Sequence, residues 1–300
     1  MKKIYYLFFL LLIVALSACD RNATINDLPS RYATLEDGTK VHYKTVGEGD
    51  IVLLFVHGFG CDMNVWEKQY EGFKHDPIRM IFVDLPGFGE SDKPETEYTL
   101  QYFADALKAV VDTLQVKKVV LVGHSLGTTV CRQFVFDYPA QSVALCDIDG
   151  VYCFYPTNPT ALLKYQTNIR SFVDGFKGEG CKEYITEFAE SLQGPFTPQE
   201  IVDYAMSTMP ETPEYVASST MSNLVDPSNW TGEKINIPSL IICTRASQIP
   251  DDNKRIMDHL YNDFTYVEFD NTGHFIMMED AGVVNNLIER SYERWRQTEL

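Results

Sequence analysis

The sequence predicts an α/β fold: a mostly parallel sheet flanked by helices, with an inserted helical cap. Short apolar runs alternate with helix-length amphipathic segments over most of the chain. Parallel strands are buried on both faces, so they read as continuous apolar runs, and each needs a crossover connection to the next. Residues 151–226 interrupt this alternation with helical, aromatic-rich patterns. A chain of 300 residues is long enough for one such domain with an insertion.

The chain is expected to enter the sheet through an antiparallel hairpin. Strand-forming residues cover Arg31–Leu35 and Val41–Val46, and the Asp37-Gly38 pair between them is typical of a hairpin turn. These two strands should therefore form the antiparallel edge of the sheet.

Three buried strands, each followed by a helix, are expected next. Thr99 can cap the second of these helices, in which Phe103, Leu107 and Val110 fall on one face. The expected elements in order are the strand Ile51–Val56, the helix Val65–Phe73, the strand Met80–Val83, the helix from Thr99 to Leu114, the strand Lys118–Val122 and the helix Leu126–Tyr138.

The sheet is then expected to continue, pause for the cap and resume. The remaining predicted elements are the strand Val143–Ile148 before the cap and, after it, the strand Ser239–Cys243, a helix ending at Leu260, the strand Thr265–Phe269 and a helix over Ala281–Trp295. Because the sheet resumes, the segment between reads as an insertion rather than an independent domain. The predicted core is therefore residues 31–150 and 227–300, and the predicted cap is residues 151–226.

The first 30 residues are predicted to be an address followed by a tether. Two lysines precede the apolar stretch Ile4–Leu16, which is too short and wrongly flanked for an ordinary membrane span. It ends in Leu-Ser-Ala-Cys at residues 16–19, which resembles a bacterial lipobox. The resemblance implies a lipoprotein signal peptide over residues 1–19, with Cys19 lipidated and retained; a plain secretory signal or an uncleaved anchor is the alternative. Residues 20–30, which are polar, are expected to form a tether.

Composition excludes several classes of function. The formal net charge of −17 argues against nucleic acid, whose phosphates require Lys/Arg patches. Phosphate-loop, dinucleotide-binding and zincin motifs do not occur in the sequence, and neither does Cys/His spacing typical of a metal site. No cofactor and no metal are therefore expected. Cys153 and Cys181 are the one pair for which a disulfide is suspected.

The motif Gly-His-Ser-Leu-Gly at residues 123–127 predicts a nucleophilic serine. It lies directly between an apolar strand run and a helical pattern. Such a motif places a serine hydroxyl on a sharp strand-to-helix turn, with a positive φ at the serine. The flanking glycines let the strand and the returning helix approach closely. Ser125 is therefore the candidate nucleophile.

Four motifs together resemble the alpha/beta-hydrolase fold superfamily. They are His-Gly-Phe-Gly at 57–60, Asp-Leu-Pro-Gly-Phe-Gly-Glu-Ser at 84–91, the serine motif at 123–127 and Gly-His-Phe at 273–275. The resemblance covers nearly everything after the tether and implies a serine hydrolase with a helical cap. Residues 57–62 with Trp66 also look like the small-capped hydrolases related to bacterial stress-signalling and plant hormone-receptor hydrolases.

The superfamily resemblance points to His274 as the general base. His274 follows the last predicted strand, where the superfamily carries its base, and it would take the proton of Ser125. The other histidines are expected elsewhere: His42, His75 and His259 at the surface, His57 at the oxyanion turn with a structural role, and His124 pointing away from Ser125.

Two backbone N–H groups should form the oxyanion hole. The N–H of Leu126 follows the nucleophile and lies at a helix N-terminus, where the helix dipole favours negative charge. The second donor is expected to be the N–H of Phe59, in a turn whose glycines allow close approach to substrate.

The acid that completes the triad is not at its usual place. Relatives usually carry an aspartate after the strand Ser239–Cys243, and here Ser247 occupies that position. Asp149 lies at the end of the preceding core strand, where haloalkane dehalogenases and some other relatives keep their acid. We expect Asp149 to orient His274; Asp251 or Asp252, or no acid at all, are the alternatives.

These residues favour a lipid-anchored serine hydrolase that cleaves a carboxylic ester of a small to medium apolar acyl or aryl compound. Its expected partners are this small-molecule substrate and, through Cys19, a membrane of the bacterial cell envelope, with the catalytic domain outside the cytoplasm. A hydrolase-fold sensor or binding protein with slow or vestigial turnover is the first alternative, and a cofactor-free perhydrolase is the second.

Overall fold

The computed structural model describes residues 23–153, 156–230, 232–245 and 253–299. Within them an eight-stranded sheet has the order β1-β2-β4-β3-β5-β6-β7-β8. Strands β1 and β2 form the hairpin and pair antiparallel, as does β2 with β4, and all other neighbours are parallel. The strands are β1 Arg31–Thr34, β2 Lys40–Val46, β3 Ile51–Val56, β4 Arg79–Val83, β5 Lys118–His124, β6 Ser142–Ile148, β7 Ser239–Thr244 and β8 Phe264–Phe269.

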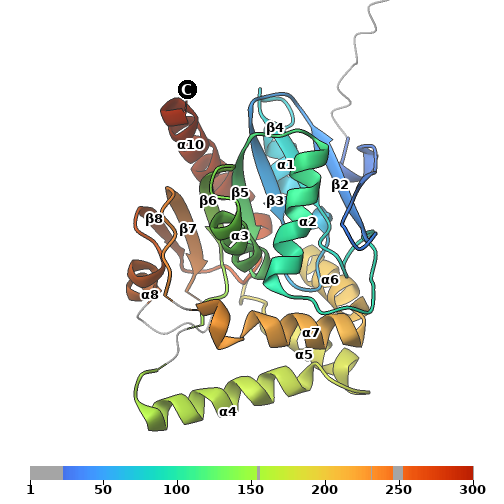
Figure 1. Cartoon of the computed structure of the whole chain (residues 1–300), viewed down its shortest axis with the longest axis vertical. Coiled ribbons are helices and arrows are strands. Elements are labelled where there is room, and N and C mark those ends of the chain that lie inside the picture. The colour runs from blue at the N-terminus through green and yellow to red at the C-terminus, as the bar shows by residue number, and fades with distance from the viewer. Residues whose placement is uncertain (1–22, 154–155, 231, 246–252, 300) are drawn as a thin grey trace, which may run out of the picture.

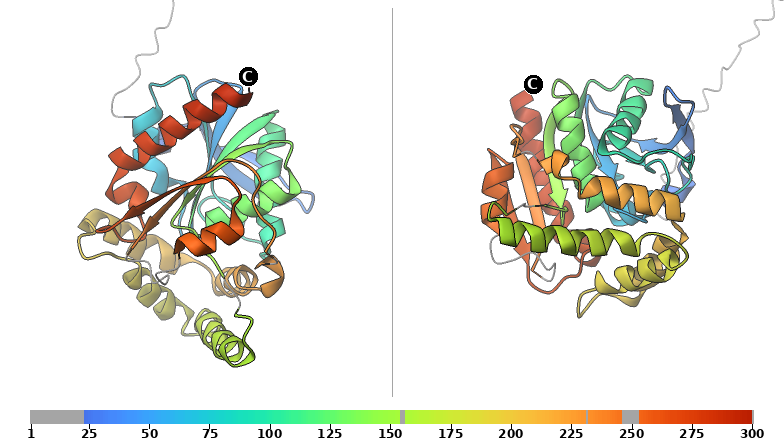
Figure 2. Two further views of the ribbon diagram at one scale, coloured as in Figure 1. Left: turned by 90° about the vertical axis from the view of Figure 1, so that its left-hand side faces the viewer. Right: turned by 60° about the horizontal axis from the view of Figure 1, so that its bottom comes forward.

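Helices cover both faces of this sheet (Figures 1 and 2). Helices α1 (Glu67–Phe73) and α10 (Ala281–Glu299) pack together on one face. Helices α2 (Leu100–Thr113), α3 (Leu126–Asp137) and α8 (Asn253–Leu260) lie on the other. The central strands β3, β5 and β6 are buried except at Lys118, the first residue of β5, so the mostly parallel, doubly covered sheet predicted from the apolar runs is confirmed.

Four longer helices lie between β6 and β7 and sit across the carboxyl ends of the parallel strands (Figure 1). They are α4 Pro159–Gly175, α5 Cys181–Ser191, α6 Gln199–Thr208 and α7 Glu214–Leu224. Aromatic rings hold this group together: Phe176 is fully buried and packs against Phe172, Tyr184 and Phe188. The group closes over the edge of the sheet where ligands bind in open α/β folds.

The prediction of a tether over residues 20–30 is wrong for Ala23–Asp27. The side chain of Ile25 is fully buried, and its N–H donates to Glu67 at 2.9 Å. The Lys44 ammonium donates to the carbonyl oxygens of Ile25 and Asn26, both at 3.1 Å. The segment Ala23–Asp27 is therefore docked on the core, because one apolar side chain and several backbone groups find partners there.

Two further expectations fail. His42 is 1% exposed rather than at the surface, because its Nδ1 faces a carboxylate, Asp84, at 2.8 Å. Cys153 and Cys181 are free thiols, so the suspected disulfide is not formed.

Candidate active site

Ser125 stands on a sharp turn between β5 and α3. Its backbone has φ 53° and ψ −121°, so the predicted positive φ is confirmed. A Cβ at Gly123 would lie 2.6 Å from the Cα of Thr128, and one at Gly127 would lie 2.2 Å from the carbonyl oxygen of Val56. Real Cβ contacts are not this short, so both flanking positions require glycine for the strand and helix to meet.

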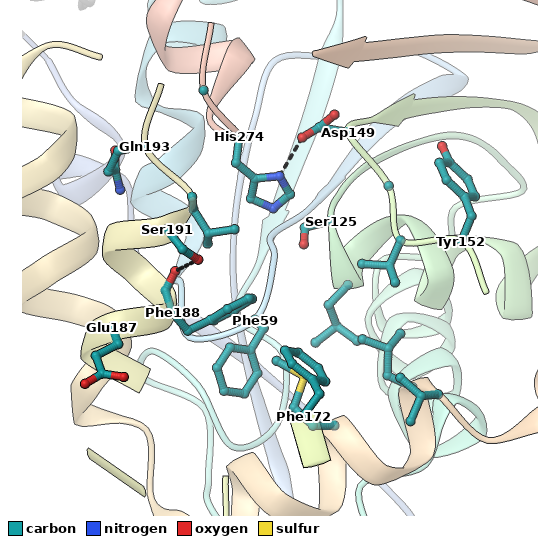
Figure 3. A pocket seen from close by; sticks show the side chains of 18 of the residues that line it. Phe59, Ser125, Asp149, Tyr152, Phe172, Glu187, Phe188, Ser191, Gln193 and His274 are labelled. Carbon is teal, nitrogen blue, oxygen red and sulfur yellow. Dashed lines mark hydrogen bonds and ion pairs between the residues drawn. The ribbon is translucent and has the colours of Figure 1, made fainter. Parts of the chain in front are cut away.

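His274 and Asp149 form a hydrogen-bonded pair beside this serine. The Nδ1–H of His274 donates to Asp149 Oδ2 at 2.6 Å, and the carboxylate is 1% exposed. Figure 3 shows the imidazole between Asp149 and Ser125, with its other nitrogen toward the hydroxyl. Among the described residues no hydrogen bond joins Ser125 to the ring, which is common before substrate binds.

The carboxylate of Asp149 is held by the neighbouring strand. The second carboxylate oxygen, Oδ1, accepts the backbone N–H of Thr244 at 3.0 Å. The backbone N–H of Asp149 donates to the carbonyl oxygen of Ile242 at 2.7 Å. The contribution of Thr244 here is a backbone donor. This contact was not foreseen, because it joins the ends of two strands that are distant in sequence. The competing acids Asp251 and Asp252, and Ser247, lie outside the described residues.

The two residues expected to supply the oxyanion donors line one cavity. Phe59 and Leu126 both line it, together with Ser125. Leu126 is the first residue of α3, where an N–H has no intrahelical acceptor. Within the described part of the chain, the N–H of Phe59 donates to no protein acceptor either. A Cβ at Gly58 would lie 3.0 Å from the Cβ of Ser125, so this turn runs directly against the serine.

Buried polar groups fix the turn that carries Phe59. The Nδ1–H of His57 donates to the carbonyl of Gly58 at 2.8 Å, and its Nε2 accepts the N–H of Leu85 at 3.0 Å. Burial lowers the pKa of His57, so the ring is neutral and serves as both donor and acceptor. The structural role expected for His57 agrees with these contacts.

The carboxylate of Asp84 holds the chain next to the turn that carries Phe59. It accepts from His42 Nδ1 and from the N–H of Met63, each at 2.8 Å. Burial alone would raise the pKa of Asp84, but the hydrogen bonds from His42 and from the N–H groups of Glu90 and Met63 pull it down, and the net effect is a lowered pKa. The carboxylate therefore stays ionised and holds the segment that follows the oxyanion turn.

His124 supports the candidate base from behind. Its Nε2–H donates to the carbonyl oxygen of His274 at 3.0 Å, and the two rings lie 4.6 Å apart. Burial lowers the pKa of His124 strongly, so the ring is neutral. The sequence indicated only that this side chain avoids Ser125; its contact with His274 depends on a loop 150 residues further along.

A cavity of about 550 Å³ opens over Ser125 and is walled mainly by apolar side chains (Figure 3). Phe172, Tyr184 and Phe188 form its aromatic wall on α4 and α5. The remaining lining residues include Val151, Tyr152, Leu192, Met221, Leu224 and Val225, with Glu187, Ser191 and Gln193 as polar members. Such a cavity suits an apolar ligand of small to medium size.

Two features are absent from the part of the chain that the structure describes. No cluster of three or more His, Cys, Asp or Glu side chains there could hold a metal ion. No described helix has the length and apolar character needed to cross a bilayer.

Comparison with known proteins agrees with this architecture. The AB hydrolase superfamily protein YisY of Bacillus subtilis is 25% identical over 86% of this chain and 97% of its own length. The bifunctional epoxide hydrolase 2 of Sus scrofa is 22% identical over 91% of this chain, which spans 56% of that longer protein. The esterase EaEST of Exiguobacterium antarcticum superposes with a TM-score of 0.77 at 17% identity, over 88% of this chain and 100% of the esterase.

A family model for the alpha/beta hydrolase fold matches residues 51–281, from the first parallel strand to the start of α10. With the sheet order, the serine turn and the cap between β6 and β7 already in place, the match covers more than half of the chain, and the protein belongs to the alpha/beta hydrolase fold family.

Proposed function

We propose that this hydrolase cleaves carboxylic esters through an acyl-enzyme, with Ser125 as nucleophile, His274 as general base and Asp149 as the residue that orients the base. The supporting observation is the alignment of three groups around one cavity. The 2.6 Å bond from His274 to Asp149 fixes the ring, and the ring's free nitrogen faces the serine. Phe59 and Leu126, whose N–H groups are the expected oxyanion donors, line the same cavity.

Each step of ester cleavage has a group to perform it. Nε2 of His274 takes the proton of Ser125 as Oγ attacks the carbonyl carbon, and the oxygen of the tetrahedral intermediate accepts from Phe59 and Leu126. Nε2 then protonates the leaving alcohol and activates a water that hydrolyses the acyl-enzyme. Each oxyanion donor contributes about 3 kcal/mol to transition-state stabilisation in well-studied enzymes. Asp149 stabilises the imidazolium that forms in both half-reactions.

The nucleophile separates ester cleavage from epoxide opening, although epoxide hydrolases are among the similar proteins. Attack by a carboxylate on an epoxide carbon gives an ester, which water can hydrolyse. Attack by Ser125 on the same carbon would give an alkyl ether, which has no carbonyl for water to attack. A serine at this turn therefore favours acyl substrates.

The cavity argues for an uncharged acyl or aryl group of small to medium size. Its wall is mainly apolar and aromatic, and no Lys or Arg is among the described residues that line it. An anionic substrate group would thus lose its hydration without gaining a cationic partner. The net charge of −17 opposes anionic substrates further.

We further propose that the protein is a lipoprotein of the bacterial cell envelope, held on a membrane through lipidated Cys19, with the hydrolase domain outside the cytoplasm. The support is the sequence of residues 1–19, with its two lysines, apolar stretch and Leu-Ser-Ala-Cys ending. Two or more acyl chains on a single cysteine are sufficient to anchor a protein stably in a membrane.

Ser125→Ala tests the enzyme proposal directly. Without the hydroxyl no acyl-enzyme can form, so turnover of p-nitrophenyl esters should fall at least about 10³-fold, and labelling by a fluorophosphonate probe should vanish. Ser207→Ala, which removes an exposed cap serine, is the control and should label and turn over as wild type.

Two other outcomes are informative. Ester turnover that survives in Ser125→Ala would exclude the serine as nucleophile. Rapid labelling of the wild type without turnover of esters of any chain length would favour the alternative, a sensor or binding protein that uses the same pocket.

A further inference from the structure

A second group of polar side chains lies behind the pocket and has no part in the ester chemistry above. Its centre is Asp147, near the end of β6, whose side chain is fully buried. The hydroxyls of Tyr152 and Tyr261 both donate to Asp147 Oδ2 at 2.5 Å, and the N–H of Gly150 donates to Oδ1 at 3.2 Å. A buried carboxylate is costly unless such donors surround it, so this arrangement needs a reason.

The cluster joins separate segments of the chain. Gly150 and Tyr152 belong to the loop after β6, whereas Tyr261 directly follows α8. Tyr152 lines the pocket, as Figure 3 shows, but Tyr261 is 1% exposed and is not among the lining residues. One carboxylate thus ties the pocket loop to the far end of a helix outside the site.

The same carboxylate lies against the nucleophile turn. A Cβ at Gly150 would lie 2.5 Å from Asp147 Oδ1 and 2.9 Å from Cγ2 of Thr128. Thr128 in turn donates its N–H to the carbonyl of Ser125 at 3.0 Å. The serine turn and the loop after β6 are therefore packed together around Asp147.

The loop that this cluster holds contains a strained residue. Asp149 has φ 45°, a left-handed conformation that is unfavourable for a residue other than glycine. Such a conformation persists where surrounding contacts over-determine it. The contacts of Asp147 with Gly150 and Tyr152 restrain the chain just after Asp149, and the bond from the N–H of Asp149 to Ile242 restrains Asp149 itself.

We propose that Asp147 is a positioning residue: its carboxylate, held by Tyr152 and Tyr261, keeps the loop in the conformation that directs Asp149 at His274. The inference rests on the proposed ester hydrolysis, in which Asp149 orients the base. Asp147 itself touches neither substrate nor the reacting atoms.

The ionisation of Asp147 agrees with this role. Burial raises its pKa, the hydroxyls of Tyr152 and Tyr261 and the positive charge of Arg132 pull it back, and the net result is a pKa of about 6. The group is therefore a carboxylate at neutral pH and can accept from both tyrosines at once.

Tyr261→Phe is the most informative variant, because Tyr261 has no contact with the pocket. Loss of one hydroxyl on the carboxylate should loosen the loop and lower kcat for a p-nitrophenyl ester by about tenfold, with KM unchanged. Tyr152→Phe keeps the ring in the pocket wall and should lower kcat to a similar degree. Asp147→Asn puts an amide among donors and should reduce kcat by more than either.

Tyr292→Phe is the matched control. Tyr292, on α10, is 2% exposed and also donates one buried hydroxyl, to the carbonyl of Ile51 at 2.9 Å. Helix α10 lies on the face of the sheet opposite α8 (Figure 2). Tyr292→Phe should lower the melting temperature about as much as Tyr261→Phe and leave kcat at the wild-type value.

A second readout does not depend on turnover. The proton between His274 Nδ1 and Asp149 should give a far-downfield ¹H NMR signal in wild type and Tyr292→Phe, and that signal should shift or broaden in Tyr261→Phe. If kcat and this signal in Tyr261→Phe both match those of Tyr292→Phe, the positioning role is wrong while ester hydrolysis stands. If the wild type does not cleave esters, the NMR comparison still decides the positioning role. Should Asp147→Asn fail to fold, the two tyrosine variants decide the question.

Discussion

Several side chains of the candidate site hold His274 in one position. Asp149 accepts from His274 and from the backbone of Thr244, while His124 donates to the carbonyl of His274. The ring of His274 is thus held through its Nδ1 and its backbone at once. Since Nδ1 carries the proton toward Asp149, Nε2 is left as the acceptor that a general base requires.

Asp149→Asn should show how much the carboxylate of Asp149 contributes to kcat. The amide can keep the geometry but favours the wrong imidazole tautomer, so kcat for an ester substrate should fall by up to about 10⁴-fold, by analogy with other triads. Steady-state kinetics of the folded variant measure this.

Asp251→Asn and Asp252→Asn test the competing acids. Both should be mild beside Asp149→Asn, and Ser247→Ala likewise. A variant of Asp251 or Asp252 that loses activity as severely as Asp149→Asn, or an Asp149→Asn protein with wild-type turnover, would move the orienting role elsewhere.

At the scale of elements, the cap is joined to the loop of the candidate base. The N–H of His274 donates to the carbonyl of Leu192, just after α5, at 2.9 Å. Gly194 and Gly273 pass so closely that a Cβ at Gly194 would lie 2.5 Å from the nitrogen of Gly273. The position of the cap therefore affects the position of His274 through main-chain contacts, not only the shape of the pocket.

Gly194→Ala should reduce turnover without adding a group to the pocket. The new methyl would push the chain after α5 away from Gly273 and weaken the bond from His274 to Leu192, so kcat should fall about tenfold or more. Gly180→Ala is the control: a Cβ at Gly180 would meet no atom within 4 Å, so turnover should be unchanged. Equal kcat in the two variants would show that the cap and base loop act independently.

At the scale of the whole molecule, the proposed anchor Cys19 is separated from the folded domain by few residues. The described chain begins at Ala23, and Ile25 is already buried against the core. Residues 20–22, between Cys19 and Ala23, can span at most about 14 Å when extended. A lipid on Cys19 would therefore hold the hydrolase domain near the membrane surface, with little freedom to move away from it.

Cys19→Ser tests the anchor. Without the thiol, no diacylglyceryl group can attach and signal peptidase II should not process the chain, so an uncleaved or mislocalised precursor is expected. Membrane fractionation and intact-mass measurement of the protein from cells check this. Native protein with an unmodified N-terminus at another residue would contradict the anchor.

The sequence by itself determined what is local in this protein. Apolar runs such as Ile51–Val56 form buried strands, and the crossover helices follow from the parallel sheet. The motif at residues 123–127 also predicts the positive φ of Ser125, because the clash that Gly123 avoids is with Thr128, within the same turn.

Tertiary structure decided what depends on distant partners. That Asp149 faces His274 follows from the pairing of β6 with β7 and from the loop after β8, 125 residues further along. The sequence places His42 on an edge strand, but its hydrogen bond to Asp84 allows the ring to be buried. The sequence places Asp147 in a buried strand, and its carboxylate is stabilised there by hydroxyls of tyrosines from two other segments. A polar side chain can be buried only where other segments of the fold supply its hydrogen-bond partners, and the local sequence does not show which segments these are.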